Sequence, residues 1–278
     1  MIEVSNISFR YPGQGKKVFN GLNLRLEENA IYGLLGKNGM GKSTLLYLIS
    51  GLLQTKEGKI SVDGHDPRDR KPEMLREIYI VTEDFDLPAM TLSEYVKINA
   101  PFYPNFSQEV LDNCLREFDL EGNPRLNALS MGQKKKVYMS FALATGTRYL
   151  FMDEPTNGMD IPSKAQFRKV VAQGMTDGRT VVISTHQVHD VENLLDHVII
   201  INNSEILLNS SVEDICRQYV FEYRAPNDMA DAIYAEPSLQ GNAVMAPRGD
   251  KPETTLNLEL LFDAMVLKAK NTQGGNKA

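Results

Sequence analysis

The sequence predicts an α/β fold built on a mixed, mainly parallel sheet, and three observations support this prediction. A short apolar run at residues 30–35 leads into a glycine-rich loop, after which residues 44–50 have the pattern of a helix ended by Gly51. A second apolar run, at residues 149–152, ends in two adjacent carboxylates. Further apolar runs alternate with helical patterns, as expected of strands joined by crossover helices.

The N-terminal segment has a different pattern. Residues 2–10 and 18–26 alternate in part between apolar and polar side chains, which predicts strands of an antiparallel sheet. Residues 59–62 and 78–81 have the composition of further strands. We therefore expect an N-terminal antiparallel β subdomain attached to the main sheet.

The pattern becomes helical between about residues 84 and 147. Thr91 and Glu94 form a capping-box signature for a first helix, and Ser107 opens a second one with apolar side chains at helical spacing. Ser130 is a candidate N-cap for a third helix. These signals predict a helical insertion in the α/β core.

Strand patterns return after the insertion, at residues 180–184 and 198–201, and Asp160 followed by Pro162 marks a helix start before them. Beyond residue 210 the pattern is harder to assign, although residues 220–223 resemble a strand and Leu258–Lys270 has a helical period. The polar residues 271–278 are expected to be frayed. The predicted organisation is a domain at 1–210, with a core (1–83 and 148–210) and a helical subdomain (84–147), followed by a C-terminal extension (211–278) that is regulatory, dimerising or added packing.

Composition narrows the class of protein. The 278 residues are 42% hydrophobic and 24% charged, which is ordinary for a globular protein. The net charge of −6 and the pI near 5.4 argue against nucleic acid as a partner. The first ten residues have no signal-peptide pattern, and no apolar run approaches the roughly 20 residues that span a bilayer. Cys114 and Cys216 lack metal-ligand spacing, so we expect reduced thiols.

The glycine-rich loop has the pattern G-x-x-x-x-G-K-S-T between a predicted strand and a predicted helix. Glycines allow the backbone N–H groups of such a loop to approach phosphate oxygens, and the following helix adds its positive end. Lys42 would reach the β- and γ-phosphates, and the Ser43 hydroxyl would bind Mg²⁺. The sequence therefore predicts a P-loop NTPase core whose phosphate-binding residues are Gly36, Lys37, Asn38, Gly39, Met40, Gly41, Lys42, Ser43 and Thr44.

The two carboxylates, Asp153 and Glu154, follow the strand at 149–152, at the edge of the sheet where ligands bind in α/β folds. Asp153 would hold Mg²⁺ directly or through water. Glu154 would accept a proton from the attacking water as general base. An isolated Asp-Glu pair would more often be a solvated turn, but its position after an apolar strand favours the catalytic interpretation.

Between these motifs, Leu129–Gln133 reads Leu-Ser-Met-Gly-Gln. With the three motifs in this order, residues 1–210 resemble the ATP-binding subunit of ABC transporters, most of all those of ABC-2-type exporters. The family signature is Leu-Ser-Gly-Gly-Gln, so Met131 replaces one glycine. The resemblance implies that the signature of one subunit completes the ATP site of a second subunit, with contacts in trans from Ser130, Met131, Gly132 and Gln133.

The resemblance assigns roles to further positions. Asn157, Gly158 and Asp160 match the loop at the dimer seam, and His186 matches the histidine that senses the γ-phosphate. On chemistry alone, His186 fits a polar residue at a strand end equally well. Tyr11 lies where the family places an aromatic ring on adenine, although a tyrosine packed in the hairpin would have the same pattern.

One residue departs from the family. At the junction of the core and the helical subdomain, where the family has glutamine, this chain has Glu83. A carboxylate only accepts hydrogen bonds and adds negative charge near the triphosphate. We expect Glu83 to remain a metal or water contact while altering the coupling between ATP binding and subdomain rotation.

The resemblance implies an ATPase that uses ATP and Mg²⁺, works as a homodimer or with a paralogue, and drives export through a separate multi-span membrane permease. It also implies a cytoplasmic protein that is peripheral on the inner face of the cell membrane, with no nucleic acid as partner. Phe85 and Leu87 are candidate docking residues for the permease, or ordinary packing between subdomains. The alternative function is a soluble ABC ATPase that acts in cluster assembly or on ribosomes.

Overall fold

The structure is a computed structural model that describes residues 1–239 and 241–274. Its centre is a six-stranded sheet in which five neighbouring strands are parallel and the last, at one edge, is antiparallel. This mixed sheet confirms the predicted α/β class. The strands in spatial order are β5 (Ile78–Val81), β6 (Tyr149–Asp153), β7 (Thr180–Thr185), β3 (Ile31–Leu35), β8 (His197–Asn202) and β9 (Glu205–Ser211).

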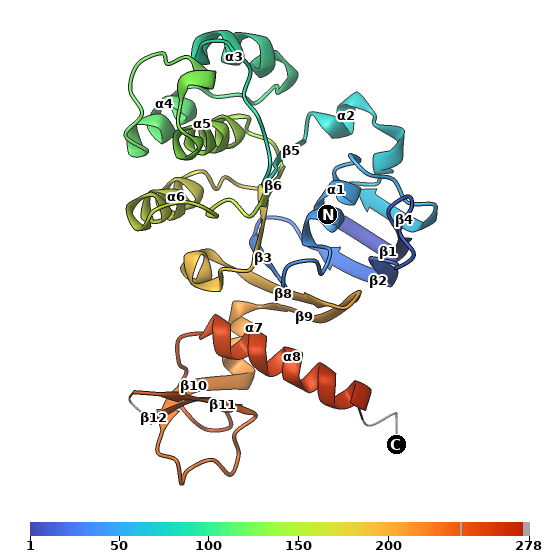
Figure 1. The fold of residues 1–278 in the computed structure, drawn as a ribbon, viewed down its shortest axis with the longest axis vertical. Coiled ribbons are helices and arrows are strands. Elements are labelled where there is room, and N and C mark those ends of the chain that lie inside the picture. Colours follow the sequence, from blue (N-terminus) through green and yellow to red (C-terminus); the bar gives the residue numbers. More distant parts are fainter. Residues whose placement is uncertain (240, 275–278) are drawn as a thin grey trace.

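The inner strands of this sheet are buried on both faces, because elements pack on either side (Figure 1). Alternate residues face two different cores. Ile31 and Leu35 belong to the core beneath the helices that follow β5 and β6, whereas Tyr32 and Leu34 belong to the core shared with the N-terminal strands. This two-sided burial is the reason that the sequence shows continuous apolar runs here rather than alternation.

The N-terminal strands form a separate antiparallel sheet, as the sequence predicts. Its order is β2–β1–β4, with β1 at Ile2–Phe9, β2 at Phe19–Leu26 and β4 at Glu57–Val62. The helix that follows the glycine-rich loop, α1 (Lys42–Ile49), packs with this sheet against the central one. A short helix, α2 (Pro72–Leu75), leads into β5.

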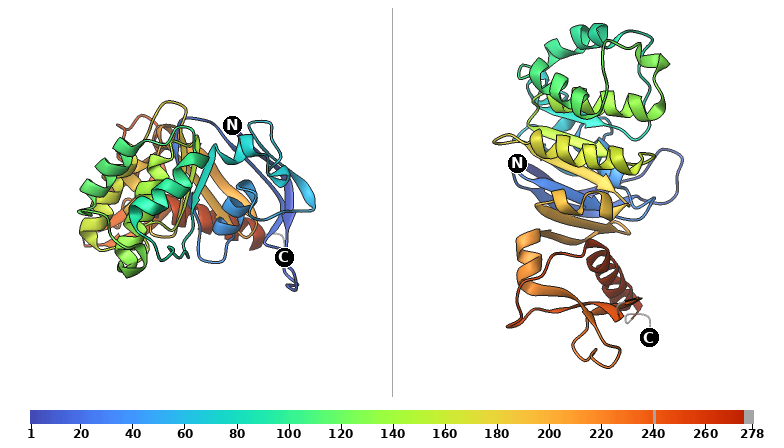
Figure 2. Two further views of the ribbon diagram at one scale, coloured as in Figure 1. Left: turned by 90° about the horizontal axis from the view of Figure 1, so that it is seen from above. Right: turned by 90° about the vertical axis from the view of Figure 1, so that its left-hand side faces the viewer.

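The predicted helical insertion connects β5 to β6 and contains α3 (Leu92–Asn99), α4 (Gln108–Glu117) and α5 (Met131–Ala144). Its N-caps are those expected. Thr91 and Glu94 form a reciprocal capping box, the Ser107 hydroxyl accepts from the Val110 N–H, and Ser130 forms a second capping box with Gln133. The insertion has a small apolar core of its own, which includes Leu87. Figure 2 shows the insertion as a distinct tier beyond the sheet.

Helix α6 (Ile161–Gln173) lies between the insertion and β7 and begins at its N-cap, Asp160. The loops at the opposite end of the sheet converge on Arg179, which is buried. Its guanidinium donates to the carbonyl oxygens of Leu143, Thr147 and Gly174, at 3.0, 3.0 and 2.6 Å. One side chain therefore satisfies carbonyls at the ends of both α5 and α6, which is where helices leave such groups unpaired.

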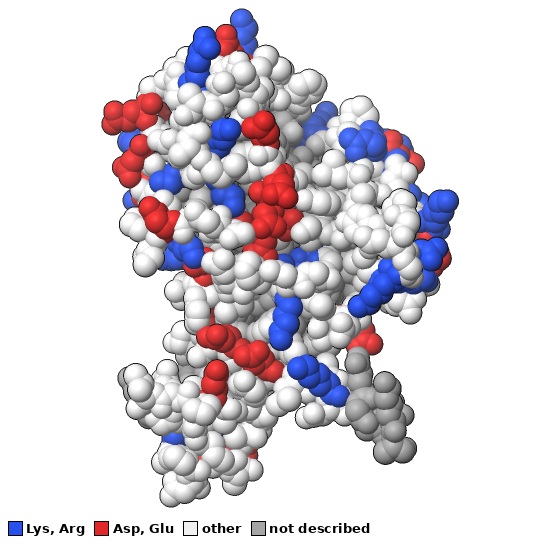
Figure 3. Space-filling view, in the orientation of Figure 1, with Lys and Arg blue, Asp and Glu red and all other residues white. Residues whose placement is uncertain are grey.

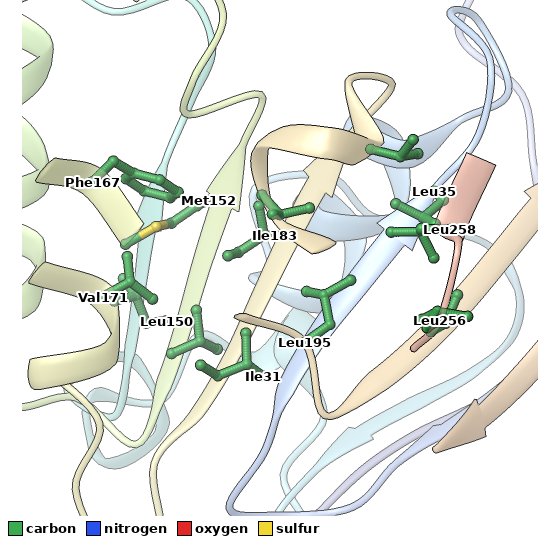
Figure 4. Close-up of a cluster of buried hydrophobic side chains, with 14 of the residues drawn as sticks. Ile31, Leu35, Leu150, Met152, Phe167, Val171, Ile183, Leu195, Leu256 and Leu258 are labelled. Atoms are coloured by element: carbon green, nitrogen blue, oxygen red, sulfur yellow. The ribbon is translucent and has the colours of Figure 1, made fainter. Parts of the chain in front are cut away.

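The segment after β9 has more regular structure than the sequence suggests. It contains α7 (Val212–Gln218), the antiparallel sheet β10–β12–β11 (Tyr219–Arg224, Gly241–Pro247, Tyr234–Ser238) and α8 (Leu258–Gly274). The expectation that the chain frays from residue 271 is wrong up to Gly274, because α8 continues to that residue. Residues 275–278 lie outside the described residues. Leu256 and Leu258 join the same apolar cluster as Leu195 beside the central sheet (Figure 4).

The state of the two cysteines agrees with the expectation from the sequence. Cys114 and Cys216 are free and buried, and burial raises the pKa of each thiol. Among the helices described for residues 1–239 and 241–274, none combines the length and the apolar character that a membrane crossing requires.

Candidate active site

The glycine-rich loop lies between the end of β3 and the first turn of α1, so the chain runs from strand to loop to helix as predicted. At two positions of the loop only glycine fits, because neighbouring atoms lie too close for a Cβ atom. A Cβ at Gly36 would meet the Ile201 carbonyl oxygen at 2.8 Å. Gly41 has a φ of +96°, and a Cβ at this position would lie 2.8 Å from the Phe19 ring. The backbone can therefore curl tightly before α1 only because these residues lack side chains.

Lys42, Glu154 and His186 meet at the carboxyl ends of β3, β6 and β7. The Lys42 ammonium lies 3.2 Å from Glu154 Oε1 and donates to the Gly36 carbonyl oxygen at 2.7 Å. His186 Nδ1 lies 2.9 Å from the same Glu154 oxygen. The side chains of Lys42 and Glu154 are each 6% exposed, whereas His186 is 34% exposed. The cluster joins an ammonium, a carboxylate and an imidazole that reaches solvent.

Glu154 has an uncommon backbone conformation, with a φ of +46° in the left-handed region. Such a conformation costs a non-glycine residue about 1–3 kcal/mol and persists only where the surroundings hold it. Its N–H donates to the Ser184 carbonyl oxygen at 3.0 Å, and its carbonyl accepts from the Asn157 N–H at 3.2 Å. The turn after β6 directs the Glu154 side chain to Lys42 and His186.

Asp153 is fully buried at the end of β6. Its Oδ1 accepts a hydrogen bond from the Ser184 hydroxyl on β7, and Tyr47 on α1 donates to Oδ2 at 3.4 Å. Burial, followed by the nearby Asp153 charge, raises the pKa of Tyr47 to about 12. Asp153 is therefore fixed by side chains from two neighbouring elements beside the phosphate loop.

A cavity of about 340 Å³ opens over the loop, with Glu154 at its base. Tyr11 and Thr44 both line this cavity, and their hydroxyl oxygens are 3.0 Å apart. The expected binding residues do not all line it: Lys37 is exposed, and Met40 packs with the N-terminal core. The lining residues are Tyr11, Gln14, Val18, Asn38, Gly39, Gly41, Lys42, Ser43, Thr44, Glu83 and Glu154.

Glu83 lies at the junction of the core and the insertion, as the sequence predicts. Its Oε1 accepts a hydrogen bond from Asn157 Nδ2 at 2.8 Å. Asn157 in turn accepts a bond from Lys135 on α5, whose ammonium lies 2.9 Å from the Asn157 carbonyl oxygen. Sequence reasoning misses Lys135, because it stands in a run of three lysines whose directions cannot be read from composition.

The signature residues occupy the N-terminus of α5. The Ser130 N–H donates to Gln133 Oε1 at 3.0 Å, and the Gln133 N–H donates to the Ser130 hydroxyl at 3.3 Å. Met131 is 64% exposed. Met131 and Gly132 line a second cavity of about 330 Å³, together with Glu83, Lys135 and Asn157–Met159. The structure therefore does not bring the signature residues to the phosphate loop of their own chain.

The remaining predicted positions lie near the signature or away from the site. Gly158 and Asp160 follow Asn157 in an exposed loop, where Asp160 caps α6. His65, His189 and His197 lie outside the cluster. His197 stacks on Tyr32, with ring centroids 4.8 Å apart, and His189 pairs with Glu259.

The oxygen donors at this site have the chemistry that Mg²⁺ prefers, namely a serine hydroxyl and carboxylates. Ser43 and Glu83 line the cavity over the loop, and Asp153 lies beside it. Within the described residues, no group of three or more His, Cys, Asp or Glu side chains converges as a metal site.

Comparisons with known proteins identify this arrangement. The family model described as "ABC transporter" matches residues 19–157, from β2 through the phosphate loop and signature to Asn157. The chain belongs to the ABC transporter family. The ATP-binding protein NatA of Bacillus subtilis is 29% identical over 226 residues, covering 77% of this chain and 91% of NatA. The bacitracin transport ATP-binding protein BcrA of Bacillus licheniformis is 30% identical, covering 74% of this chain and 68% of BcrA.

Solved structures agree with this assignment. An ATP-binding subunit of an ABC transporter superposes with a TM-score of 0.69 at 26% identity, covering 78% of this chain and 92% of that one. A dimeric ATP-binding cassette in a post-hydrolysis state with ADP and Pi gives a TM-score of 0.66 at 25% identity, covering 76% and 98%. This ABC protein is accordingly an ATP-binding subunit that hydrolyses ATP.

Proposed function

We propose that this ABC subunit drives export through a separate multi-span membrane subunit by hydrolysing ATP at the interface of a dimer. The observation that supports the dimer most directly is the separation of the signature from the phosphate loop. Ser130 and Met131 are exposed at the N-terminus of α5, and Met131 and Gly132 line a cavity other than the one over the loop. A helix N-terminus attracts anions, so a second subunit could supply its own bound phosphate there.

Within one site, each side chain has a chemical role that its geometry supports. Lys42 holds the β- and γ-phosphates, and the negative charge of the phosphates replaces its present contact with Glu154. Glu154 then accepts the proton of the attacking water as general base, and His186, 2.9 Å from its Oε1, orients that carboxylate and contacts the γ-phosphate. Tyr11 stacks on adenine at the rim of the cavity.

Mg²⁺ fits the donor set of this site. Ser43, Asp153 and Glu83 are the residues that would hold it, directly or through water, and the ion would neutralise charge on the phosphates. Asp153 is already oriented by Ser184 and Tyr47, so it needs no rearrangement to act as an acceptor.

Export as the direction of transport rests on relatives. BcrA is a bacitracin transport protein, and the linearmycin resistance ATP-binding protein LnrL of Bacillus subtilis is 30% identical over 78% of this chain and 71% of LnrL. Resistance to a toxic compound and transport of an antibiotic fit removal from the cell. The subunit would then be cytoplasmic and bound peripherally to the inner face of the cell membrane, and no role for nucleic acid is expected.

The membrane partner would dock on the insertion. Leu87 is only 4% exposed and packs in the core of the insertion, so the packing alternative holds for this residue. Phe85 is half-buried against Tyr138, with ring centroids 4.7 Å apart. Ile98 and Phe102, near the end of α3, are 55% and 69% exposed. Phe85, Ile98 and Phe102 are therefore the candidate docking side chains.

The C-terminal extension, from α7 to α8, is proposed to stabilise the dimer. Tyr223 on β10 is 57% exposed and Ile233 is 40% exposed, and the face in Figure 3 shows few charged side chains over the sheet β10–β12–β11. Replacing Tyr223 and Ile233 with serine should weaken the dimer, measured by light scattering after gel filtration. Replacing Leu52, 52% exposed in the N-terminal part, with serine is the matched control.

A mixing experiment tests the composite site. Lys42→Ala inactivates the phosphate loop and Ser130→Ala the signature, so each variant alone should be inactive. A mixed pair, however, contains one site with an intact loop from the Ser130 variant and an intact signature from the Lys42 variant. ATPase activity should therefore return on mixing. If the mixture forms dimers yet remains inactive, the composite site is refuted.

A fractionation experiment tests the transporter assignment. Tagged protein should copurify from membranes with a multi-span protein. A chain that stays in the supernatant and binds RNA would instead indicate a non-transport ABC ATPase.

A further inference from the structure

Lys135 connects the helical insertion to the catalytic turn. It lies in the second turn of α5 and is 5% exposed. Its ammonium donates to the carbonyl oxygen of Glu154 at 3.2 Å and to that of Asn157 at 2.9 Å. Both carbonyls belong to the turn after β6, which is part of the core. The helix that begins with the signature is thus hydrogen-bonded to the backbone of the residue that would act as base.

The turn needs such support. Glu154 has a φ of +46°, and the carbonyl that Lys135 contacts directly follows this strained torsion. Hydrogen bonds to a charged donor are stronger than those between neutral groups. Lys135 makes two such bonds, to the carbonyl oxygens of Glu154 and Asn157. The Glu154 N–H is held separately, by its hydrogen bond to the Ser184 carbonyl oxygen. A shift of α5 would consequently move the Glu154 carboxylate relative to Lys42 and His186.

Lys135 also balances charge. A buried ammonium is costly unless opposite charge lies nearby, and burial lowers the pKa of Lys135 while Glu83, Glu154, Asp153 and Asp84 oppose that change in this order. Asn157 links Lys135 to Glu83, since its carbonyl oxygen accepts from Lys135 and its side-chain amide donates to Glu83 at 2.8 Å. Glu83 lines both cavities. The carboxylate of Glu83 is thus connected through Asn157 to the ammonium of Lys135, and both residues line the second cavity.

We propose that Lys135 is a positioning residue for ATP hydrolysis, which fixes the Glu154 turn through its two carbonyl contacts and offsets the charge of Glu83. The signature helix and the general base of the same subunit then move as one unit. Besides its proposed contact with Mg²⁺, Glu83 acts through Asn157 and Lys135, and this charge balance explains how a carboxylate is tolerated where the family has an amide. This inference rests on the proposed role of Glu154.

The neighbouring lysines provide the matched control. Lys136 is the next residue along α5, and its ammonium lies 3.4 Å from the Phe118 carbonyl oxygen and 3.0 Å from Gln166 Oε1. The substitution Lys136→Met therefore also removes a positive charge and a contact with a carbonyl oxygen. Those partners are not in the turn after β6. Lys136→Met should therefore leave kcat close to that of the parent.

Lys135→Met keeps the aliphatic length and removes the ammonium. It should lower kcat by about 10- to 100-fold, the range for loss of a charged donor, with little change in the KM for ATP because Lys135 does not line the cavity over the loop. Glu83→Gln should lower kcat in the parent. In the Lys135→Met background it should instead raise kcat by about fivefold or more, because it removes an unbalanced carboxylate. Lys135→Gln is the second variant, which keeps one N–H donor without charge.

Three results would overturn the inference: a parental kcat in Lys135→Met, an equal factor for Glu83→Gln in both backgrounds, or loss of folding in both Lys135 variants. The last result would mean that the Lys135 ammonium is needed for folding and has no separate role in hydrolysis. The Glu154→Gln variant is measured in parallel. Full turnover in that variant overturns the proposed base, whereas an inactive Glu154→Gln beside a normal Lys135→Met overturns only the inference about Lys135.

Discussion

Glu154→Gln is the sharpest test of the site because it removes one charge and almost no volume. The side chain is 6% exposed, with Oε1 3.2 Å from the Lys42 ammonium and 2.9 Å from His186 Nδ1. Glutamine can still hydrogen-bond to His186, but it cannot accept the proton of water. A general base contributes about 10²–10⁴-fold in rate, so turnover should fall by that factor, which corresponds to about 3–5 kcal/mol in the barrier.

The same variant should change the response of stability to ATP. Breaking a buried ion pair typically costs about 3–5 kcal/mol, because the surviving ion has no partner. Lys42 retains the Gly36 carbonyl at 2.7 Å, and bound phosphates would supply new negative charge. We therefore expect the variant to melt at a lower temperature than the parent without nucleotide, and to gain more than the parent from ATP and Mg²⁺.

The assays are phosphate release at saturating ATP, thermal melting with and without ATP, and gel filtration, in which the variant should accumulate as an ATP-bound dimer. Glu109→Gln, on the exposed face of α4, is the control for removing a carboxylate. Turnover equal to that of the parent would refute Glu154 as the base. An equal ATP-induced gain in melting temperature for both proteins would refute the argument from the Lys42 pair.

Three further predictions concern the fold around the site. Phe167 is fully buried on α6, so Phe167→Ala should lower the free energy of unfolding by about 3–5 kcal/mol in urea titrations. Phe102 is exposed, and a smaller loss of stability in Phe167→Ala than in Phe102→Ala would contradict the placement of α6. Burial raises the pKa of Cys114 to about 11, so iodoacetamide at neutral pH should modify it only after denaturation, as followed by mass spectrometry, and rapid modification of the native protein would disprove its burial. Burial, with Asp153 nearby, raises the pKa of Tyr47 to about 12; since the unfolded value is about 10, stability from this group is complete below pH 10 and is lost as the pH rises through about 12. Urea titrations across this range should show a shallower decline in Tyr47→Phe than in the parent, and equal slopes would refute the raised pKa of Tyr47.

Much of this fold could be predicted because strong local signals agree with the tertiary structure. Runs such as residues 149–152 are continuous and apolar since β6 is covered on both faces. Ser107 and Ser130 mark helix starts by hydrogen bonds that need only a few neighbouring residues. Strand β9 escapes prediction, because this antiparallel edge strand is only partly buried. In β11, Pro237 weakens the strand pattern, and an edge strand tolerates it.

The candidate site is predictable where one motif supplies adjacent residues and less so where the partners are distant. The phosphate loop and the Asp153–Glu154 pair are each local. The hydroxyl of Ser184 and the phenol of Tyr47 reach Asp153 only because β7 and α1 flank β6 in space. Lys134, Lys135 and Lys136 are adjacent in sequence but about 100° apart around a helix. Only the packing of α5 decides which of them is buried.

The apolar cluster shared by the C-terminal extension and the central sheet has a practical consequence. A protein shortened after β9 would keep every motif from the phosphate loop to His186. It would also uncover Val191 and Leu195, which now pack in one cluster with Leu256, Leu258 and Leu261. Newly exposed apolar surface of this kind promotes aggregation. Expression and crystallisation trials should therefore retain the extension, and an insoluble shortened protein would report lost packing rather than a lost activity.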